Sequence, residues 1–403
     1  MKIKKLSILV LVLAMNCLEI GCSGTEKGSV FLDANGEIIG RVSSEYGSVS
    51  SDKEYYYDYL ITAMKETTEI ICRKQSVSEE KAFEYLYEEN YTIHTEFDSD
   101  LQSKVYETLK GYEDKDFTDY AIAITDLNGN LVASFSADWD NENLTNGSLK
   151  NRYPCSTIKP LSVYAPLLDE KKITWSSVQT DTYIKYVKDS DGVQRKWPAN
   201  LDGQYSNVNV TVVDAIKDSY NTVAVKWLQE LTVSKSYEFL DRIGVNTEYE
   251  KKISSTDGNE EVLGNLAMGY LRQGVTVIDM AGYYQMFANG GEYSEPTAVG
   301  IINRDGKELY HKKTEQKQII EPTTAYIMNK LLCNVVTNGT GREAQVNNMV
   351  IGGKTGTTGT AGNCLAILTQ NAYGKPFVSI VMGASTKELL YQEMNSLLQN
   401  INS

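Results

Sequence analysis

Two predicted β-hairpins, one on each side of a long helical region, most constrain how this chain of 403 residues can fold. In residues 121–135, two apolar runs flank Asn128-Gly129, a dipeptide typical of a tight type I′ turn. Residues 365–382 repeat the pattern, with a turn around Gly374 and Pro376, and an amphipathic helix follows. Outer strands around a mostly helical middle predict an α+β domain whose sheet unites the two hairpins.

The N-terminus has the features of a signal peptide. Three lysines among the first five residues precede an apolar run over residues 6–15, which is too short to span a bilayer. The pair Gly21-Cys22 resembles a bacterial lipoprotein cleavage site, after which Cys22 would carry lipid and anchor the protein. Glu19 departs from that pattern, so ordinary secretion and an uncleaved anchor remain alternatives. Each alternative places the protein outside the cytoplasm.

Four segments are expected along the chain. Residues 1–22 are the signal peptide with the possible lipoprotein site, and residues 23–51, rich in Ser and Gly, are a tether with a short hairpin around Asn35-Gly36. Residues 52–95 show helical periodicity and are expected to form a helical pedestal. The catalytic part is expected over residues 96–403.

The composition excludes some functions. A net charge of −14 disfavours nucleic acid as a partner and leaves no polybasic patch for a membrane. The 27 tyrosines are expected to be scattered structural residues, with a glycan-binding surface as the alternative. The cysteines beyond the leader show no metal-ligand spacing and are expected to be buried free thiols, although a disulfide stays possible. With only His94 and His311, a serine hydrolase here needs a base other than histidine.

The first motif, Ser156-Thr157-Ile158-Lys159, can supply an activated nucleophile. If the motif starts a helix, the spacing of three places Ser156 and Lys159 on one face. A serine hydroxyl is a weak nucleophile until a neighbour takes its proton, which a lysine of lowered pKa can do. The alternative is an exposed helix start with the lysine in water.

Two later motifs complete a set that suits acyl transfer. Ser219 could relay a proton to a leaving amine while Asn221 binds a substrate amide. In the predicted strand Lys354–Thr358, a lysine and two threonine hydroxyls can hold a carboxylate, and Gly356 allows a substrate backbone to approach closely. The backbone N–H groups of Ser156 and Thr357 could form an oxyanion hole. Each motif alone is weak, but their ordered combination indicates a peptidase for substrates with a free carboxylate.

These motifs and their flanking stretches resemble the transpeptidase domain of penicillin-binding proteins, most closely the bifunctional class that also polymerises glycan. The resemblance extends over about residues 55 to 403. The matching stretches are Leu86–Gln102, Tyr153–Pro160, Trp197–Asn200, Asn221–Lys226, Gly274–Thr276, Phe287–Gly291 and Gly339–Arg342. The resemblance implies a fold like that of serine β-lactamases and transpeptidases, with an antiparallel sheet of about five strands flanked by helices.

The resemblance also implies roles for the motif residues. Ser156 is the nucleophile acylated by D-Ala-D-Ala stem peptides of peptidoglycan and by β-lactams, and Lys159 is its general base. Ser219 and Asn221 assist proton transfer and binding. The residues that bind the terminal carboxylate are Lys354, Thr355 and Thr357. No cofactor or metal is expected, and the expected location is the extracytoplasmic face of a bacterial cell membrane.

Three departures from the family pattern are visible. The glycan-polymerising domain of the bifunctional class is expected to be absent, because residues 23 to 54 are too few for it. Cys155 stands where a glycine is usual, and Val277 replaces an expected proline. After the third motif, residues 361–384 resemble serine D,D-carboxypeptidases more than transpeptidases.

Four outcomes of the chemistry follow. Transfer of the acyl group to water gives a D,D-carboxypeptidase, which the C-terminal resemblance favours, and transfer to an amine gives a cross-linking D,D-transpeptidase. A β-lactamase needs a carboxylate to activate water, and Glu261 and Asn265 have a suitable spacing, although the resemblance assigns them to a structural segment. A sensor that is acylated and never released is the fourth interpretation, but no cytoplasmic signalling segment is evident.

Overall fold

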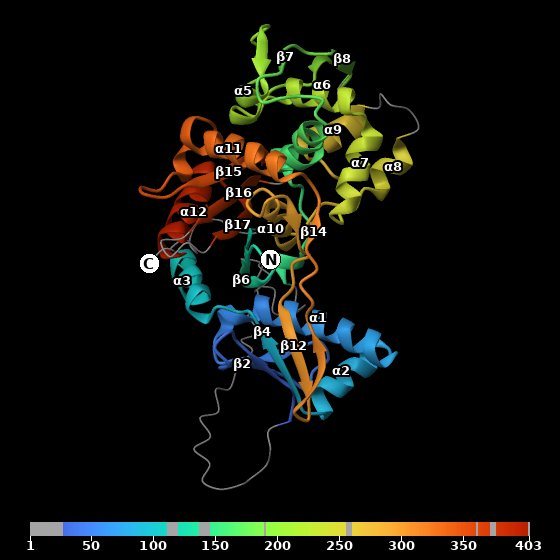
Figure 1. The fold of residues 1–403 in the computed structure, drawn as a ribbon, viewed down its shortest axis with the longest axis vertical. Helices are drawn as coiled ribbons and strands as arrows, with labels where there is room; N and C mark the ends of the chain where they lie inside the picture. Colours follow the sequence, from blue (N-terminus) through green and yellow to red (C-terminus); the bar gives the residue numbers. More distant parts are fainter. Residues whose placement is uncertain are drawn as a thin grey trace, which may run out of the picture.

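The computed structural model describes residues 27–110, 120–136, 146–188, 191–254, 260–359, 362–370 and 376–401 (Figure 1). The predicted leader over residues 1–22, including Cys22, lies outside this part of the chain. Within the described residues, no helix combines the length and apolar character that crossing a membrane would need.

A five-stranded antiparallel sheet forms the centre of the molecule, in the order β15-β16-β17-β5-β6. Its strands are β5 (Ala121–Asp126), β6 (Leu131–Ser136), β15 (Ile351–Thr358), β16 (Gly362–Gln370) and β17 (Pro376–Ala384). The two predicted hairpins meet where β17 pairs with β5, with Phe377 opposite Asp126 and Met382 opposite Ala121. The α+β fold with a sheet of about five strands that unites the hairpins is therefore confirmed.

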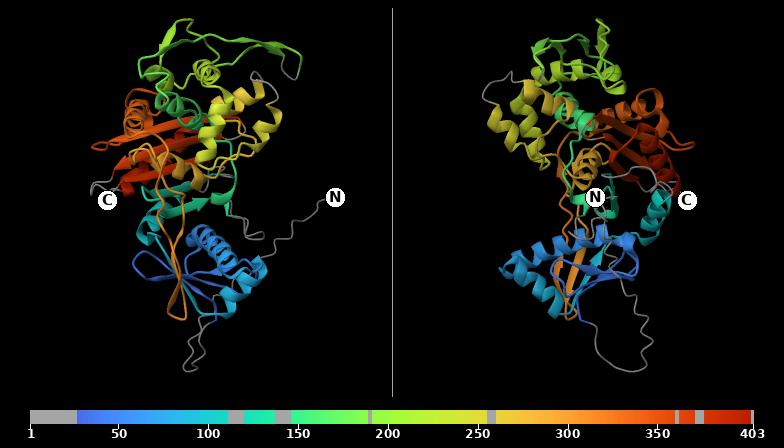
Figure 2. Two further views of the ribbon diagram at one scale, coloured as in Figure 1. Left: turned by 45° about the vertical axis from the view of Figure 1, so that its right-hand side comes forward. Right: turned by 180° about the vertical axis from the view of Figure 1, so that it is seen from behind.

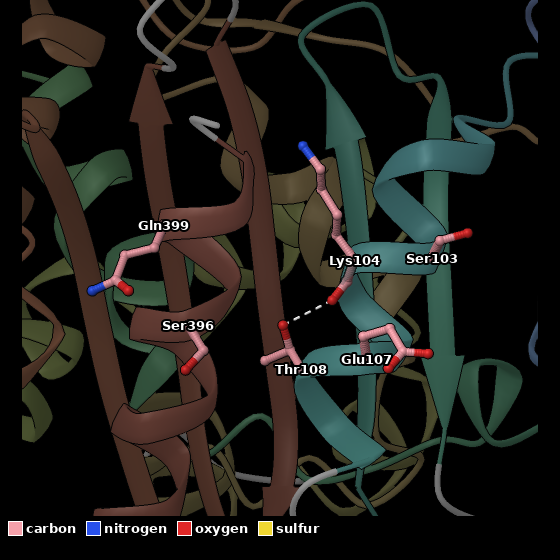
Figure 3. Close-up of a pocket in the computed structure, with 6 residues that line it drawn as sticks. All are labelled: Ser103, Lys104, Glu107, Thr108, Ser396 and Gln399. Carbon is pink, nitrogen blue, oxygen red and sulfur yellow. Dashed lines mark hydrogen bonds between the residues drawn. The ribbon is translucent and has the colours of Figure 1, made fainter.

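The two faces of this sheet are covered by different helices because side chains alternate along each strand. On β5, Ile122 and Ile124 pack with α3 (Ser99–Lys110) and α12 (Lys387–Ile401), whereas the smaller Ala121 and Ala123 face α10 (Val277–Gln285). Figure 3 shows α3 and α12 side by side, with a groove of about 480 Å³ between them. α11 (Pro322–Asn338) lies against β15.

A second sheet, of six strands, forms an N-terminal lobe below the first (Figure 2). Its order is β13-β12-β4-β1-β2-β3. Its strands are β1 (Val30–Leu32), β2 (Ile38–Val42), β3 (Val49–Ser50), β4 (Tyr91–Thr95), β12 (Val299–Arg304) and β13 (Lys307–His311). α1 (Tyr57–Gln75) and α2 (Glu79–Glu88) pack beside this sheet.

The N-terminal lobe differs from the expected tether and helical pedestal. The short hairpin around Asn35-Gly36 forms between β1 and β2, with Gly36 at φ 84°. Residues 30–50 are nevertheless strands of a sheet rather than a tether, and the pedestal over residues 52–95 ends in β4. The lobe also takes β12 and β13 from residues 299–311, so the boundary expected at residue 96 does not separate two continuous units.

The buried helix α1 joins the N-terminal lobe to the central sheet. The Tyr59 hydroxyl is completely buried and lies 3.0 Å from the carbonyl oxygen of Leu131 and 3.1 Å from that of Ala298. The Glu66 carboxylate accepts a hydrogen bond from the Ala298 N–H at 2.7 Å, and burial raises the pKa of Glu66 to about 7. These contacts fix the lobe against the sheet on which the site is built.

The middle of the chain is mostly helical, as expected, and lies above the central sheet (Figure 1). Its helices are α4 (Ala165–Asp169), α5 (Val212–Lys217), α6 (Asn221–Leu231), α7 (Val233–Arg242), α8 (Glu248–Ile253) and α9 (Glu260–Met268). Its strands are β7 (Val178–Thr180), β8 (Lys185–Lys188), β9 (Gln194–Trp197) and β10 (Asn209–Thr211). The short strands β11 (Glu292–Tyr293) and β14 (Lys317–Gln318) pair with each other.

Candidate active site

The first motif lies on a 3₁₀ turn, η3 (Cys155–Ile158), which continues into a π-helical turn, η4 (Pro160–Tyr164). A 3₁₀ helix has three residues per turn, so residues three apart are eclipsed. Ser156 and Lys159 therefore lie on one face of the segment, with Ser156 half-buried and Lys159 completely buried. This burial excludes the alternative of a helix start with its lysine in water.

The backbone just before the nucleophile is held in an unusual conformation. Cys155 has φ 53°, in the left-handed region, which costs a residue with a side chain on the order of 1 kcal/mol. Its N–H donates to the carbonyl of Gly269 at 3.1 Å. A Cβ atom at Gly269 would come within 1.9 Å of the Cys155 carbonyl oxygen, so only glycine fits there. The left-handed conformation explains why glycine suits position 155, where this chain has cysteine.

The amino group of Lys159 is directed at the second motif. Its Nζ donates to the Ser219 carbonyl at 2.8 Å, to the Ser219 hydroxyl at 3.3 Å and to Asn221 Oδ1 at 2.6 Å. Within the described residues it makes no hydrogen bond to Ser156. Burial, followed by the positive charge of Lys354, holds the pKa of Lys159 well below 10.5. The amine can therefore be neutral, as a general base must be.

The second motif connects α5 to α6. Ser219 has φ 61°, the second left-handed conformation at a motif residue, and this turn aims both its carbonyl and its hydroxyl at the lysines. Asn221 is the first residue of α6 and donates through Nδ2 to the carbonyl of Ala199 at 2.7 Å. Its side chain is therefore fixed between Lys159 and the segment that precedes residue 200.

The third motif brings a second buried lysine to the same hydroxyl. Lys354 on β15 is completely buried, and its Nζ donates to the Ser219 hydroxyl at 2.7 Å and to the Thr355 carbonyl at 2.8 Å. Burial lowers the pKa of Lys354 to about 7, although Cys155 acts to raise it. Because two like charges share one oxygen, protonation of Lys354 favours the neutral form of Lys159.

Strand β15 runs directly beside the nucleophile segment. A Cβ atom at Gly356 would lie 3.0 Å from the backbone nitrogen of Ser156 and 2.7 Å from the Cβ of Cys155. The half-buried Thr357 follows on the same strand, with its hydroxyl 3.0 Å from Asn363 Oδ1. The two predicted oxyanion donors, the N–H groups of Ser156 and Thr357, thus belong to adjacent stretches of backbone.

Thr355 lies at the edge of the site, where its hydroxyl contacts that of Thr340 at 2.7 Å. Thr340 belongs to the Gly339–Arg342 stretch that precedes the strand in sequence. The structure thus places all predicted residues other than Cys22 around one site. They are Ser156, Lys159, Ser219, Asn221, Lys354, Thr355, Gly356 and Thr357.

A buried carboxylate behind the second motif was missed by the sequence analysis. Asp181 accepts hydrogen bonds from Asn200 Nδ2 at 2.8 Å and from the Thr222 hydroxyl at 2.5 Å, and Asn200 Oδ1 accepts the N–H of Asn221 at 2.9 Å. Burial acts to raise the pKa of Asp181, but hydrogen bonds led by the Ser206 N–H lower it overall. Asn200 stands in a stretch that matches the family, whereas Asp181 carries no local sequence signal.

Two thiols lie beside the nucleophile. Cys155 and Cys364 are both fully buried and free, and their sulfur atoms lie 3.5 Å and 3.9 Å from the carbonyl oxygen of Tyr153. A hydrogen bond with Cys364 lowers the pKa of Cys155, and the same contact, aided by burial, raises the pKa of Cys364. The free state expected of the cysteines holds for the four in the described residues, although Cys72 and Cys333 are only partly buried.

The geometry agrees with the comparisons with known proteins. The family model described as "Penicillin binding protein transpeptidase domain" matches residues 119–389. This chain belongs to the penicillin-binding protein transpeptidase family.

Individual relatives agree with this family. Penicillin-binding protein 1F of Bacillus subtilis is 29% identical over 351 residues, which cover 86% of this chain and 45% of that protein. Penicillin-binding protein 4 of the same organism is 31% identical over 208 residues, 51% of this chain and 31% of that protein. The chain therefore spans less than half the length of these two penicillin-binding proteins.

Solved structures share the fold. The D,D-transpeptidase domain of a peptidoglycan glycosyltransferase from Eggerthella lenta has a TM-score of 0.69 at 16% identity, covering 94% of this chain and 98% of that one. Penicillin-binding protein A of M. tuberculosis, solved as an imipenem acyl-enzyme complex, has a TM-score of 0.68 at 14% identity, covering 93% of this chain and 98% of that one. At these identities the likeness establishes the shared fold of penicillin-binding proteins.

The residues considered for a β-lactamase are not arranged for that reaction. Glu261 is exposed and accepts a hydrogen bond from the Tyr249 hydroxyl at 3.2 Å. Asn265 instead donates to the buried Glu250 at 3.0 Å, and Glu250 also accepts the N–H of Arg272 at 2.8 Å. Glu250 thus serves as an acceptor for nearby backbone and amide groups, and Asn265 is held by Glu250 rather than by Glu261.

Proposed function

We propose that this chain is an active-site-serine peptidase that acts on the D-Ala-D-Ala ends of peptidoglycan stem peptides through an acyl-enzyme on Ser156. One observation carries the proposal: Lys159 is a completely buried amine, fixed by Ser219 and Asn221, whose pKa is held well below 10.5. A neutral lysine amine one 3₁₀ turn from a serine is the base that a serine peptidase without a catalytic histidine requires.

Acylation uses the residues around Lys159 as follows. The Ser156 oxygen attacks the carbonyl between the two D-Ala residues while its proton passes to the Lys159 amine. The N–H groups of Ser156 and Thr357 stabilise the resulting oxyanion. The proton then moves from Lys159 through the Ser219 hydroxyl to the departing nitrogen, and D-Ala leaves as a free amino acid. Catalytic hydrogen bonds often tighten only when substrate is bound. The hydrogen bond through which Ser156 passes its proton to Lys159 is therefore expected to form when substrate occupies the site.

The terminal carboxylate binds beside this relay. Lys354, Thr355 and Thr357 line the strand on which it would lie, and Gly356 lets the substrate backbone pair with β15. A bound carboxylate raises the pKa of Lys354 above its value of about 7 and keeps it protonated. The protonated Lys354 in turn favours the neutral form of Lys159, so that substrate binding prepares the base.

The acyl group has two acceptors, an amine from a neighbouring stem peptide and water. The matching family model is described as a transpeptidase domain, which favours cross-linking by an amine. The carboxypeptidase-like pattern of residues 361–384 favours hydrolysis, which releases a tetrapeptide. We take the D,D-transpeptidase as the first candidate and the D,D-carboxypeptidase as the second. The leader supports work at the extracytoplasmic face of the cell membrane, with Cys22 as the lipid anchor.

Two experiments test this function. Mass spectrometry after exposure to penicillin should find the adduct on Ser156, and Ser156→Ala should abolish it. Ser396→Ala, in the groove between α3 and α12 on the other side of the sheet (Figure 3), should be acylated like the wild type. An adduct on another residue, or none, contradicts the proposal. Incubation of a pentapeptide stem with an amine acceptor then separates the candidates, since an excess of dimers indicates cross-linking and an excess of tetrapeptide indicates hydrolysis.

A further inference from the structure

A hairpin of two short strands, β8 and β9, projects from the top of the molecule (Figure 2). β8 and β9 pair from Lys185 opposite Trp197 to Lys188 opposite Gln194. The basic residues of these two strands are Lys185, Lys188, Arg195 and Lys196. The left view of Figure 2 shows the hairpin extending from the top of the molecule. Lys185 forms an ion pair with Glu260, and Asp189 and Asp191 lie between the two strands in sequence, so the hairpin as a whole carries little net charge and Lys196 is the cation that lies over aromatic rings.

Three tyrosines gather around one of these cations. The ring of Tyr183 lies 5.1 Å from that of Tyr186 and 5.9 Å from that of Tyr205. The Lys196 amine lies over two of them, 5.0 Å from the Tyr183 ring centre and 5.4 Å from that of Tyr205. Tyr186 is 52% exposed. The exposed Tyr186 ring beside an amine and phenolic hydroxyls offers stacking, charge and hydrogen bonds together.

The same region carries most of the exposed apolar side chains found in the described residues. Residues 175–208 contribute six of eleven large exposed hydrophobic residues. They are Trp175, Val178, Tyr186, Val193, Leu201 and Val208. So high a share of the exposed apolar side chains in one segment favours a binding role for that segment.

A short stretch of chain links this surface to the candidate active site. The Tyr205 hydroxyl donates to the carbonyl of Pro198 at 3.2 Å. The next residue, Ala199, accepts the hydrogen bond from Asn221 Nδ2 at 2.7 Å, and Asn200 accepts the Asn221 N–H. The tyrosine cluster is thus joined by a short, hydrogen-bonded stretch of chain to a residue that contacts Lys159.

We propose that the hairpin surface, formed by Tyr183, Tyr186, Lys196 and Tyr205, binds the glycan strand of peptidoglycan that carries the stem peptide in the cleft. This inference rests on the proposed function. The C–H faces of sugar rings stack on tyrosine, and the carboxylates of uncross-linked stem peptides suit the Lys196 amine. A mixed aromatic and cationic surface beside the cleft fits this polymer better than an apolar protein partner, because the glycan and its stem peptide are one molecule.

A matched pair of double variants tests the inference. Tyr186→Ala/Lys196→Ala removes an exposed part of the hairpin surface. Tyr326→Ala/Lys330→Ala removes a similar pair on α11, where Lys330 lies 5.3 Å from the centre of the Tyr326 ring. Binding of soluble, uncross-linked glycan strands with pentapeptide stems is measured for both, together with turnover of the isolated pentapeptide.

The Tyr186→Ala/Lys196→Ala variant should bind glycan strands about tenfold more weakly and show a higher KM for them. The control variant should bind glycan strands like the wild type. Neither should alter penicillin acylation or turnover of the isolated pentapeptide. Equal binding of glycan strands by the two variants would overturn the inference. So would a loss of turnover of the isolated pentapeptide, in the first variant, as large as its loss of glycan-strand binding. A change of oligomeric state in the first variant, with strand binding intact, would assign the surface to a protein partner instead.

The test remains valid if the proposed function fails. Binding of glycan strands does not require acylation, so it can also be measured on Ser156→Ala. A protein that binds strands through this surface but is never acylated refutes the peptidase proposal and supports the glycan site. A protein that is acylated, and whose two double variants bind glycan strands equally, supports the peptidase proposal and refutes the glycan site. Binding should also weaken as salt increases from about 50 to 500 mM, because salt screens the attraction between the Lys196 amine and the stem carboxylates.

Discussion

The lysines of the cleft and those on the surface of the N-terminal lobe have opposite electrostatic environments. Lys159 and Lys354 are completely buried, and their hydrogen bonds within the described residues go to hydroxyl, amide and carbonyl oxygens, none to a carboxylate. In the lobe, Lys27 pairs with Glu88 at 3.0 Å and Lys81 with Glu84 at 2.7 Å, both on the surface.

The pKa values differ in direction for the same reason. Hydrogen bonds to their glutamates raise the pKa of both Lys27 and Lys81, so these amines remain charged at any physiological pH. Burial lowers the pKa of both cleft lysines. A lysine is therefore an inert cation or a candidate base, depending on its burial and on whether a carboxylate is its partner.

The largest expected effect is the loss of the cleft base. Lys159→Met fills the buried site with an apolar chain of similar length and should lower the rate constant for acylation by a fluorescent penicillin about a thousandfold or more. The same change at the exposed Lys81 should leave the rate unaltered. If the Lys159 variant were acylated within tenfold of the wild-type rate, the two regions would not differ in the way described.

A smaller effect is expected from the chain of groups that positions Asn221. Asn200→Ala removes the acceptor for the Asn221 N–H and the donor to Asp181, and should slow acylation about tenfold to a hundredfold through misplacement of Asn221. The matched change at the exposed Asn209, which accepts from the Thr180 hydroxyl, should have no effect. Circular dichroism would establish that both variants fold. Equal rates for the two would remove Asn200 from the positioning chain.

The pH profile tests the coupling between the two buried lysines. Acylation should rise with pH as Lys159 loses its proton, well below pH 10.5, and for substrates with a carboxylate it should decline above about pH 7 as free Lys354 loses its charge. Lys354→Met removes a like charge near Lys159, so the pKa of Lys159 increases and the rising limb should move to higher pH. Lys330→Met serves as the exposed control. A rising limb at the same pH in both variants would show that the lysines are not coupled.

The smallest effect is expected from the contacts of Tyr59, which join the N-terminal lobe to the central sheet. Tyr59→Phe removes a buried hydroxyl that lies within hydrogen-bond distance of two carbonyls, and should lower the free energy of unfolding by about 1–2 kcal/mol. The acylation rate should be unchanged, because the cleft lysines do not contact this residue. Tyr326→Phe, at an exposed position, should leave stability as it is. Urea unfolding monitored by fluorescence measures the free energy of unfolding of both variants. A slower acylation of Tyr59→Phe would show that the Tyr59 contacts also affect the geometry of the cleft.

Some elements could be predicted because their pattern is local. The Asn128-Gly129 turn and the alternating runs around it define β5 and β6, and the spacing of three between Ser156 and Lys159 places them on one face for any helical turn. The six-stranded sheet could not be predicted in the same way. β1 and β3 are only three and two residues long, and β12 pairs with β4 across about two hundred residues.

The sequence by itself determined the chemical inventory, since three short motifs supply a serine, two lysines and a hydroxyl–amide pair, and it determined the hairpins of the central sheet. Only the tertiary structure decided that Lys159 and Lys354 are both buried and both contact the Ser219 hydroxyl, because these contacts join residues that are 60 and 135 positions apart in the chain. It also decided that Asp181 supports Asn221 through Asn200. Desolvation and charge coupling are properties of the packed interior, and no local pattern of residues encodes them.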